Sequence, residues 1–196
     1  MKQILLAVAV LVVIALPADA QRQRSSVYAD LATKEFVEKV TISNMFEIEA
    51  AELAPRKVTN PAYRDFAKMI ITDHTKAANE LKLHVKNMKG LQIPSKLDQE
   101  HRQMIQALRL ETGANFEDQY RTTQIQGYQE QIELFQDYAQ NGGNSELMMW
   151  ANNMVPTLQK HRQNADALPM PSVPVIGGVQ PRDAPTTTGN APAGHR

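Results

Sequence analysis

Residues 66–75 read FAKMIITDHT, and this stretch decides the fold class. Phe66, Ile70 and His74 recur every four residues along it, which places their side chains on one face of an α-helix. The apolar face continues in both directions, so the pattern predicts a long helix over residues 61–88 with proline at its first position. A histidine on the face meant for the core is the first chemical feature of the chain.

Four other segments have the same periodicity. The short one, residues 93–111, is mostly charged with a thin apolar face, whereas the others are long and amphipathic. Four long amphipathic helices joined by short turns can bury their apolar faces only against each other. The sequence therefore predicts an all-α fold, a four-helix bundle with one short extra helix, whose remaining helices span residues 31–58, 115–140 and 145–168. We expect Asn115 and Ser145 to cap the last two helices and Pro156 to kink the last one.

The N-terminus has the pattern of a secretory signal peptide. A short basic start is followed by an apolar run over residues 4–16 and by Ala18-Asp19-Ala20, an A-x-A cleavage pattern. The apolar run is too short for a membrane-spanning helix, which needs about 20 residues. We therefore expect residues 1–20 to be removed, with cleavage near Ala20-Gln21. The mature protein is then periplasmic or secreted and has no transmembrane segment, and association with the outer membrane stays open.

Composition divides the mature chain into three parts. Residues 21–30 form an N-terminal extension and residues 31–168 are predicted to fold as one domain. The tail, residues 169–196, contains six prolines and four glycines and has too little apolar surface to offset the entropy cost of ordering. We predict that the tail is disordered. One interpretation is that the tail docks the protein to a cell-wall or outer-membrane partner.

Composition also excludes several classes of function. The 21 basic residues balance the 21 acidic ones and form no long basic run, so a nucleic-acid partner is not expected. The chain has no cysteine, which excludes disulfide scaffolds, thiolate metal sites and thiol nucleophiles. No histidine follows a glutamate at the Glu-x-x-His spacing of dimetal carboxylate bundles. The sequence favours a protein that is not an enzyme and leaves enzymatic activity open.

Three ionisable residues lie on helix faces that are otherwise apolar. Glu47 lies on the first predicted helix, His74 on the second and His161 on the last, and Tyr128 takes the comparable position on the fourth. Helical periodicity points these side chains to the interior from different directions. A buried carboxylate is costly without a partner, so we expect Glu47 to bond to a histidine. The sequence thus predicts a buried polar layer.

The polar layer has three interpretations. In one, a glutamate oxygen and two imidazoles, those of Glu47, His74 and His161, hold a single transition metal such as zinc, iron, manganese or copper. In another, the same groups perform acid–base chemistry. The interpretation that we favour is a hydrogen-bonded layer, including Tyr128, that fixes helix register without chemistry or a cofactor. Asp73 is either a solvated neighbour of His74 or an acceptor behind a ligand.

Four segments carry a family resemblance: SNMFEIE (43–49), FAKMIITDHT (66–75), FEDQY (116–120) and VPTLQKH (155–161). Together they resemble the domain of unknown function 4142 family of exported bacterial proteins, over about residues 31–168. Members are often labelled as outer-membrane or periplasmic proteins, and the resemblance implies a ferritin-like bundle. The family has no settled activity. We therefore expect an exported envelope protein of unknown biochemical activity, with a stress-related role left open.

The resemblance bears on the polar layer as well. The family's glutamate, first histidine and last histidine fall on Glu47, His74 and His161, the residues that periodicity selects. Tyr128 stands where relatives usually carry a histidine. A phenol is a poor ligand for zinc at neutral pH, so this departure disfavours a metal site with four protein ligands in this chain.

Overall fold

The computed structural model describes the backbone of residues 18–171 and the side chains from residue 31 onward. All regular structure in this part is helical: α1 (Ala18–Lys57), α2 (Pro61–Val85), α3 (Gln99–Leu110), α4 (Gly113–Asn141) and α5 (Ser145–Asp166). The prediction of an all-α fold is confirmed. Most of the predicted signal peptide and of the proline-rich tail lies outside the described residues, so cleavage and tail docking stay predictions.

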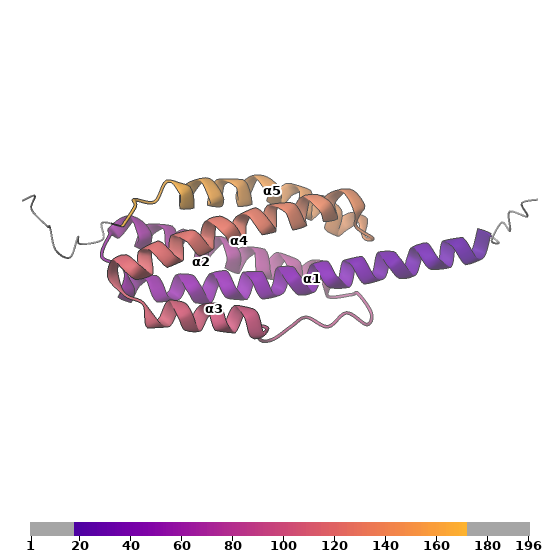
Figure 1. Ribbon diagram of the computed structural model, residues 1–196. Coiled ribbons are helices and arrows are strands. Elements are labelled where there is room, and N and C mark those ends of the chain that lie inside the picture. Colours follow the sequence, from indigo (N-terminus) through magenta and orange to yellow (C-terminus); the bar gives the residue numbers. More distant parts are fainter. Residues whose placement is uncertain (1–17, 172–196) are drawn as a thin grey trace, which may run out of the picture.

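The first helix starts earlier than predicted. α1 begins at Ala18 rather than Leu31, and its first part runs beyond the ends of the other helices (Figure 1). Residues 18–30 contain neither glycine nor proline and are rich in alanine, glutamine and arginine, which favour helix without any packing partner. The sequence interpretation relied on apolar periodicity and so missed this part. The helix ends at Lys57, two residues after its first helix breaker, Pro55.

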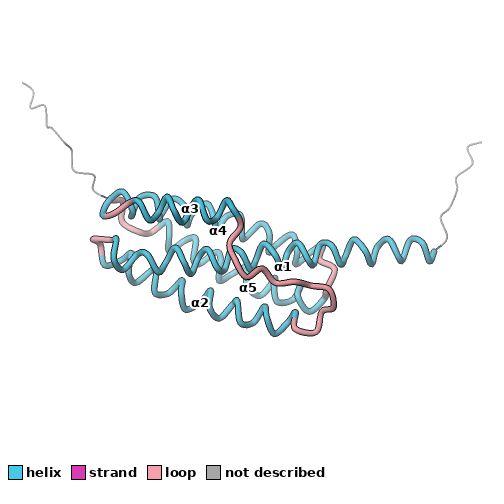
Figure 2. Tube along the Cα trace, turned by 90° about the horizontal axis from the view of Figure 1, so that it is seen from below, coloured by secondary structure: helices cyan, strands magenta, loops and turns pink. Residues whose placement is uncertain are grey.

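The four long helices pack side by side. α1 lies against α2 and α4, and α5 lies against α4 and α2. α2 and α4 run in one direction and α1 and α5 in the other, so each packed pair is antiparallel (Figure 1). This direction of α4 requires the chain to return along the bundle after α2. The return consists of an extended connection and α3, which packs mainly on α1 (Figure 2).

Besides that of α1, the starts of α3 and α4 differ from the predicted ones, whereas α2 and α5 begin at Pro61 and Ser145 as predicted. The predicted third helix from residue 93 is wrong at its start, because α3 begins only at Gln99, where the side chain of Asp98 accepts a hydrogen bond from the amide of His101. α4 begins at Gly113 with Thr112 at the cap, two residues before Asn115. The predicted cap Ser145 lies inside α5.

The cap of α5 is Asn144, which accepts a hydrogen bond from the amide of Leu147. α5 then continues through Pro156 to Asp166. α2 ends at Val85, and Gly90 follows with a φ of 78°, a backbone conformation that glycine adopts without a steric penalty. Gly90 therefore turns the chain away from α2, five residues after the helix ends at Val85. The helix itself ends three residues before the predicted residue 88.

Candidate functional site

A buried polar layer crosses the middle of the packed helices, with contributions from all four long ones. Each of its side chains is at most 7% exposed. The layer comprises Asn44 and Glu47 on α1, His74 on α2, Gln124, Tyr128 and Gln131 on α4, and His161 on α5. The structure therefore brings together all four residues that helical periodicity selected, and it adds three amides.

Glu47 lies at the α1–α4 side of the layer and is 1% exposed. Its Oε2 accepts hydrogen bonds from Nε2 of Gln124 at 2.7 Å and from the Tyr128 hydroxyl at 3.4 Å. Its Oε1 accepts one from Nε2 of Gln131 at 3.1 Å. The expectation that Glu47 bonds to a histidine is wrong. The hydrogen bonds of its carboxylate come from two amides and a phenol on the adjacent helix α4.

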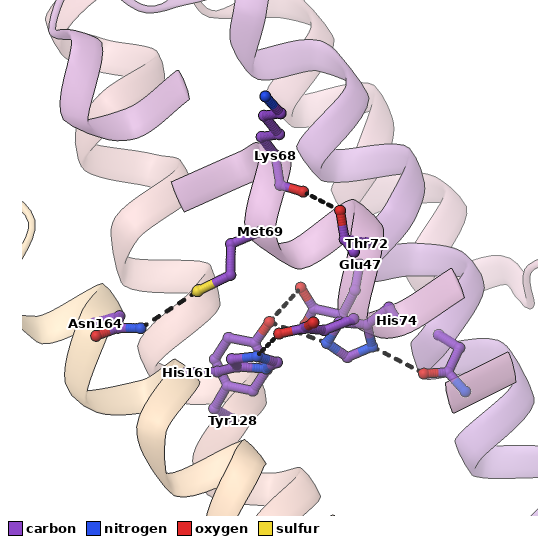
Figure 3. Close-up of polar contacts among 10 residues, drawn as sticks. Glu47, Lys68, Met69, Thr72, His74, Tyr128, His161 and Asn164 are labelled. Carbon is purple, nitrogen blue, oxygen red and sulfur yellow. Dashed lines mark hydrogen bonds and ion pairs between the residues drawn. The ribbon is translucent and has the colours of Figure 1, made fainter. Parts of the chain in front are cut away.

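His74 bridges α1 and α4 (Figure 3). Its Nδ1 lies 2.8 Å from Oδ1 of Asn44, and its Nε2 lies 3.1 Å from the Tyr128 hydroxyl. An amide oxygen only accepts hydrogen bonds, so Nδ1 is the donor and Nε2 is left to accept from the phenol. The Tyr128 hydroxyl therefore sits between the carboxylate of Glu47 and the imidazole of His74.

His161 meets the layer from α5 through ring contacts. Its ring centroid lies 5.6 Å from that of His74 and 5.3 Å from that of Tyr128. Its Nε2 lies 2.8 Å from Oδ2 of Asp73, a half-exposed carboxylate on α2 (Figure 3). Its Nδ1 is buried and has no hydrogen-bond partner among the described residues. Asp73 is thus an acceptor for the histidine of another helix and not for its neighbour His74.

Burial changes the proton affinity of the ionisable groups. Loss of solvation raises the pKa of Glu47 from 4.5 to about 7, against the opposing effect of hydrogen bonds from Gln124, Tyr128 and Gln131. Burial, and then the nearby His161, lowers the pKa of His74 from 6.5 to about 3. Burial also lowers the pKa of His161, although Asp73 opposes this shift. The layer therefore holds a carboxyl group that titrates near neutral pH beside an imidazole that stays neutral.

The three predicted metal ligands share the layer without being arranged as a cluster. Glu47 and His74 each bond to Tyr128 rather than approach one another, and His161 bonds to Asp73. Within residues 31–171, no group of three or more histidine, aspartate or glutamate side chains is placed to hold a metal ion. The arrangement is a chain of hydrogen bonds, and the assignment of Glu47, His74 and His161 as metal ligands stays a prediction.

The sequence interpretation missed two buried polar residues on α4. Gln131 donates a hydrogen bond to Glu47, and Glu117 accepts hydrogen bonds from the turn between α1 and α2. Both lie on the face marked by Tyr120, Gln124 and Tyr128, at helical spacing from these residues. Extending that face in both directions would have identified them.

Glu117 is 4% exposed and bonds to the backbone at the start of α2. Its Oε1 accepts hydrogen bonds from the amide and hydroxyl of Thr59, at 2.6 and 2.8 Å, and from the amide of Asn60 at 2.8 Å. Burial raises the pKa of Glu117, but the hydrogen bonds from Asn60 and Thr59 outweigh it and hold the pKa below 4.5. Glu117 is therefore an ionised structural group and not a member of the layer.

The fold and layer define a class of small all-α protein with a hydrogen-bonded polar interior. The family model described as a domain of unknown function, DUF4142, matches residues 17–168, and the chain belongs to this family. The resemblance recognised in the sequence is thereby confirmed. No curated protein and no solved structure matches the chain. Among the described residues, none of the helices combines the length and the apolar character needed to span a bilayer.

Proposed function

We propose that the chain is an exported envelope protein, without catalytic activity, whose buried polar layer holds its four long helices in one register. The observation that carries this proposal is the position of the Tyr128 hydroxyl between Glu47 and His74, 3.4 and 3.1 Å away. This hydroxyl joins three helices through one atom. Any shift of α4 along its axis would break both contacts and leave buried polar groups unpaired, which is costly.

The path of the chain supports a ferritin-like four-helix bundle. Each long helix is antiparallel to the two long helices that it packs against, and α2 and α4 are parallel (Figure 1). That topology needs one long crossover between the second and third long helices, which is the arrangement of ferritin-like folds. The connection over residues 86–112, including α3, supplies the crossover.

Metal analysis tests the structural role of the layer. The mature chain is refolded with one equivalent of zinc, iron, manganese or copper and compared with a variant that carries His74→Gln and His161→Gln. We expect the two proteins to retain equal metal after gel filtration, and we expect a chelator to leave the melting temperature of the parent unchanged. Retention of one equivalent by the parent and none by the variant would contradict the proposal.

The second candidate function is binding of a single transition metal by Glu47, His74 and His161. The observation that favours it is the buried Nδ1 of His161, which has no hydrogen-bond partner in the described part of the chain and belongs to a ring 5.6 Å from that of His74. A neutral imidazole nitrogen is the form that binds metals. The same metal analysis decides between the two candidates.

Export is tested separately from the layer. The A-x-A pattern before Gln21 and the apolar run before it support cleavage by a signal peptidase. We expect periplasmic or secreted material to begin at Gln21 on N-terminal sequencing. A chain that keeps Met1 and fractionates with the cytoplasm would contradict export. Deletion of the residues after Leu168 tests whether the tail retains the protein in an envelope fraction.

A further inference from the structure

A groove lies between α1, α3 and α4, on the side of the molecule away from His161. Its volume is about 470 Å³, within the range of sites that bind small molecules. Its apolar walls come from all three helices: Ile42 and Phe46 from α1, Met104 from α3 and Leu134 from α4. The groove has the apolar surface that an aliphatic ligand requires.

Glu47 reaches the floor of this groove through a gap left by Gly127. Both residues line the groove. A Cβ atom at Gly127 would lie 3.5 Å from Oε1 of Glu47 and, within residues 31–171, within 4 Å of no other side chain beyond its chain neighbours. From the side chains that the structure describes, Oε1 accepts a single hydrogen bond, from Gln131, whereas Oε2 accepts two. A carboxylate oxygen has room for a second donor, and the missing side chain of Gly127 leaves space for one.

The rim of the groove is negative. Asp98, Glu100 and Glu130 line it together with one lysine, Lys39. Nζ of Lys39 lies 2.7 Å from Oε1 of Glu35, a carboxylate outside the groove, so the lysine is already paired. His101 sits beside Asp98, whose carboxylate it bonds. The remaining rim carboxylates, with Glu47 below them, favour a positively charged ligand.

We propose that this groove binds a small organic cation, with a primary ammonium group against Oε1 of Glu47 and a short aliphatic body between Phe46 and Met104. The ammonium group supplies the donor that Oε1 lacks, and it compensates a buried charge that the protein otherwise keeps at a cost. The aliphatic body covers the apolar walls. This site uses Oε1 of Glu47, whereas the contact with Tyr128 uses Oε2.

Calorimetric titration of the full mature chain with n-hexylammonium, 1-hexanol and hexanoate tests the proposal. The three probes share one aliphatic body and differ in the charge of the head group. At pH 8 and low salt, we expect hexylammonium to bind at least about tenfold more tightly than hexanol, a difference of about 1.4 kcal/mol. Equal affinity for the ammonium and the alcohol, or no binding of hexylammonium, would overturn the proposal.

Substitutions in the groove test where the ammonium group of hexylammonium binds. Gly127→Ala places a methyl group in the gap at an ordinary contact distance, and alanine is the better helix former, so the fold should be kept. We expect this variant to lose about tenfold in hexylammonium affinity with an unchanged or higher melting temperature. Glu130→Gln should weaken binding severalfold, whereas Glu133→Gln, on the same helix but outside the groove, is the matched control. Unchanged affinity in Gly127→Ala would overturn the placement on Glu47.

Discussion

The hydroxyl group of Tyr128 lies 3.1 Å from Nε2 of His74. The same hydroxyl lies 3.4 Å from Oε2 of Glu47. A hydroxyl has one proton, so it donates to one of these acceptors at a time. Burial raises the pKa of Glu47 to about 7. When Glu47 is protonated, the Tyr128 hydroxyl donates its hydrogen bond to His74. The protonation state of the carboxyl group therefore decides whether the phenol donates to the imidazole or to the carboxylate.

Removal of this hydroxyl should destabilise the fold. Tyr128→Phe leaves Nε2 of His74 buried and without the partner that it has in the structure. We expect the free energy of unfolding in urea to fall by about 1–3 kcal/mol, the cost of an unsatisfied buried polar group. Tyr120→Phe is the matched control, because the Tyr120 hydroxyl is equally buried and has no hydrogen-bond partner in the described part of the chain. An equal loss in both variants would contradict the bridging role of Tyr128.

The layer should make stability depend on pH in two opposing ways. Glu47 has a pKa of about 7 in the folded state and 4.5 otherwise, so its contribution to stability is present below pH 4.5 and is lost as pH rises to 7. His74 has a pKa of about 3 in the folded state and 6.5 otherwise, so its contribution is present above pH 6.5 and is lost as pH falls to 3. The two effects oppose each other between pH 4.5 and 6.5.

Glu47→Gln separates these two effects. The variant lacks the carboxyl proton, so its free energy of unfolding relative to the parent should rise by about 1.4 kcal/mol for each pH unit between pH 4.5 and 7. Urea unfolding at half-unit pH steps measures this slope. Glu52→Gln, on the exposed face of the same helix, controls for the change of charge. A difference between parent and Glu47→Gln that does not change with pH would show that Glu47 is ionised throughout.

Sequence periodicity was sufficient to place the four residues of the layer but not to pair them. Apolar spacing fixes which face of a helix is buried, and so Glu47, His74, Tyr128 and His161 were predicted to point inward. Which atoms form hydrogen bonds depends on how far each helix is shifted along the bundle axis relative to its neighbours. Periodicity contains no information about this shift. The carboxylate consequently bonds to amides of α4 instead of a histidine.

Helix boundaries were predictable where a side chain at the cap leaves a local signal. Asn60 before Pro61 marks the start of α2, and the structure has both residues in those roles. The start of α1 leaves no such signal, because the sequence of residues 18–30 contains good helix formers without a regular apolar spacing. The later start of α3 reflects the choice of Asp98 over Ser95 as the cap, and both residues are good caps.

Asp73 should control the titration of His161. Burial lowers the pKa of His161, and the Asp73 carboxylate, 2.8 Å from its Nε2, opposes that shift. Asp73→Asn removes the charge that stabilises the imidazolium, so we expect the pKa of His161 to fall further. Histidine ring signals in an NMR titration measure it, and Asp65→Asn, an exposed change on the same helix, is the control. A pKa of His161 that is unchanged in Asp73→Asn would show that the pair does not persist in solution.

Glu117 should stabilise the α1–α2 turn more than its surface neighbour does. In the parent protein, three hydrogen bonds from Thr59 and Asn60 are accepted by a charged oxygen of Glu117. Glu117→Gln replaces this acceptor with a neutral amide, so we expect the free energy of unfolding to fall by about 1.5–3 kcal/mol at pH 7. Asp118→Asn, an exposed change at the next position, is the matched control.

The effect of Glu117 should also have a defined pH dependence. Its pKa in the folded state lies below 4.5, because hydrogen bonds from Asn60 and Thr59 outweigh the opposing effect of burial. Its contribution is therefore present above pH 4.5 and is lost as pH falls through the folded-state pKa. We expect the stability difference between the parent and Glu117→Gln to shrink below pH 4.5, opposite in sign to the trend for Glu47. Unfolding curves at pH 3 and pH 7 measure the sign of the trend for Glu117→Gln and for Glu47→Gln. A difference for Glu117→Gln that grows at low pH would mean that the pKa of Glu117 in the folded chain lies above 4.5.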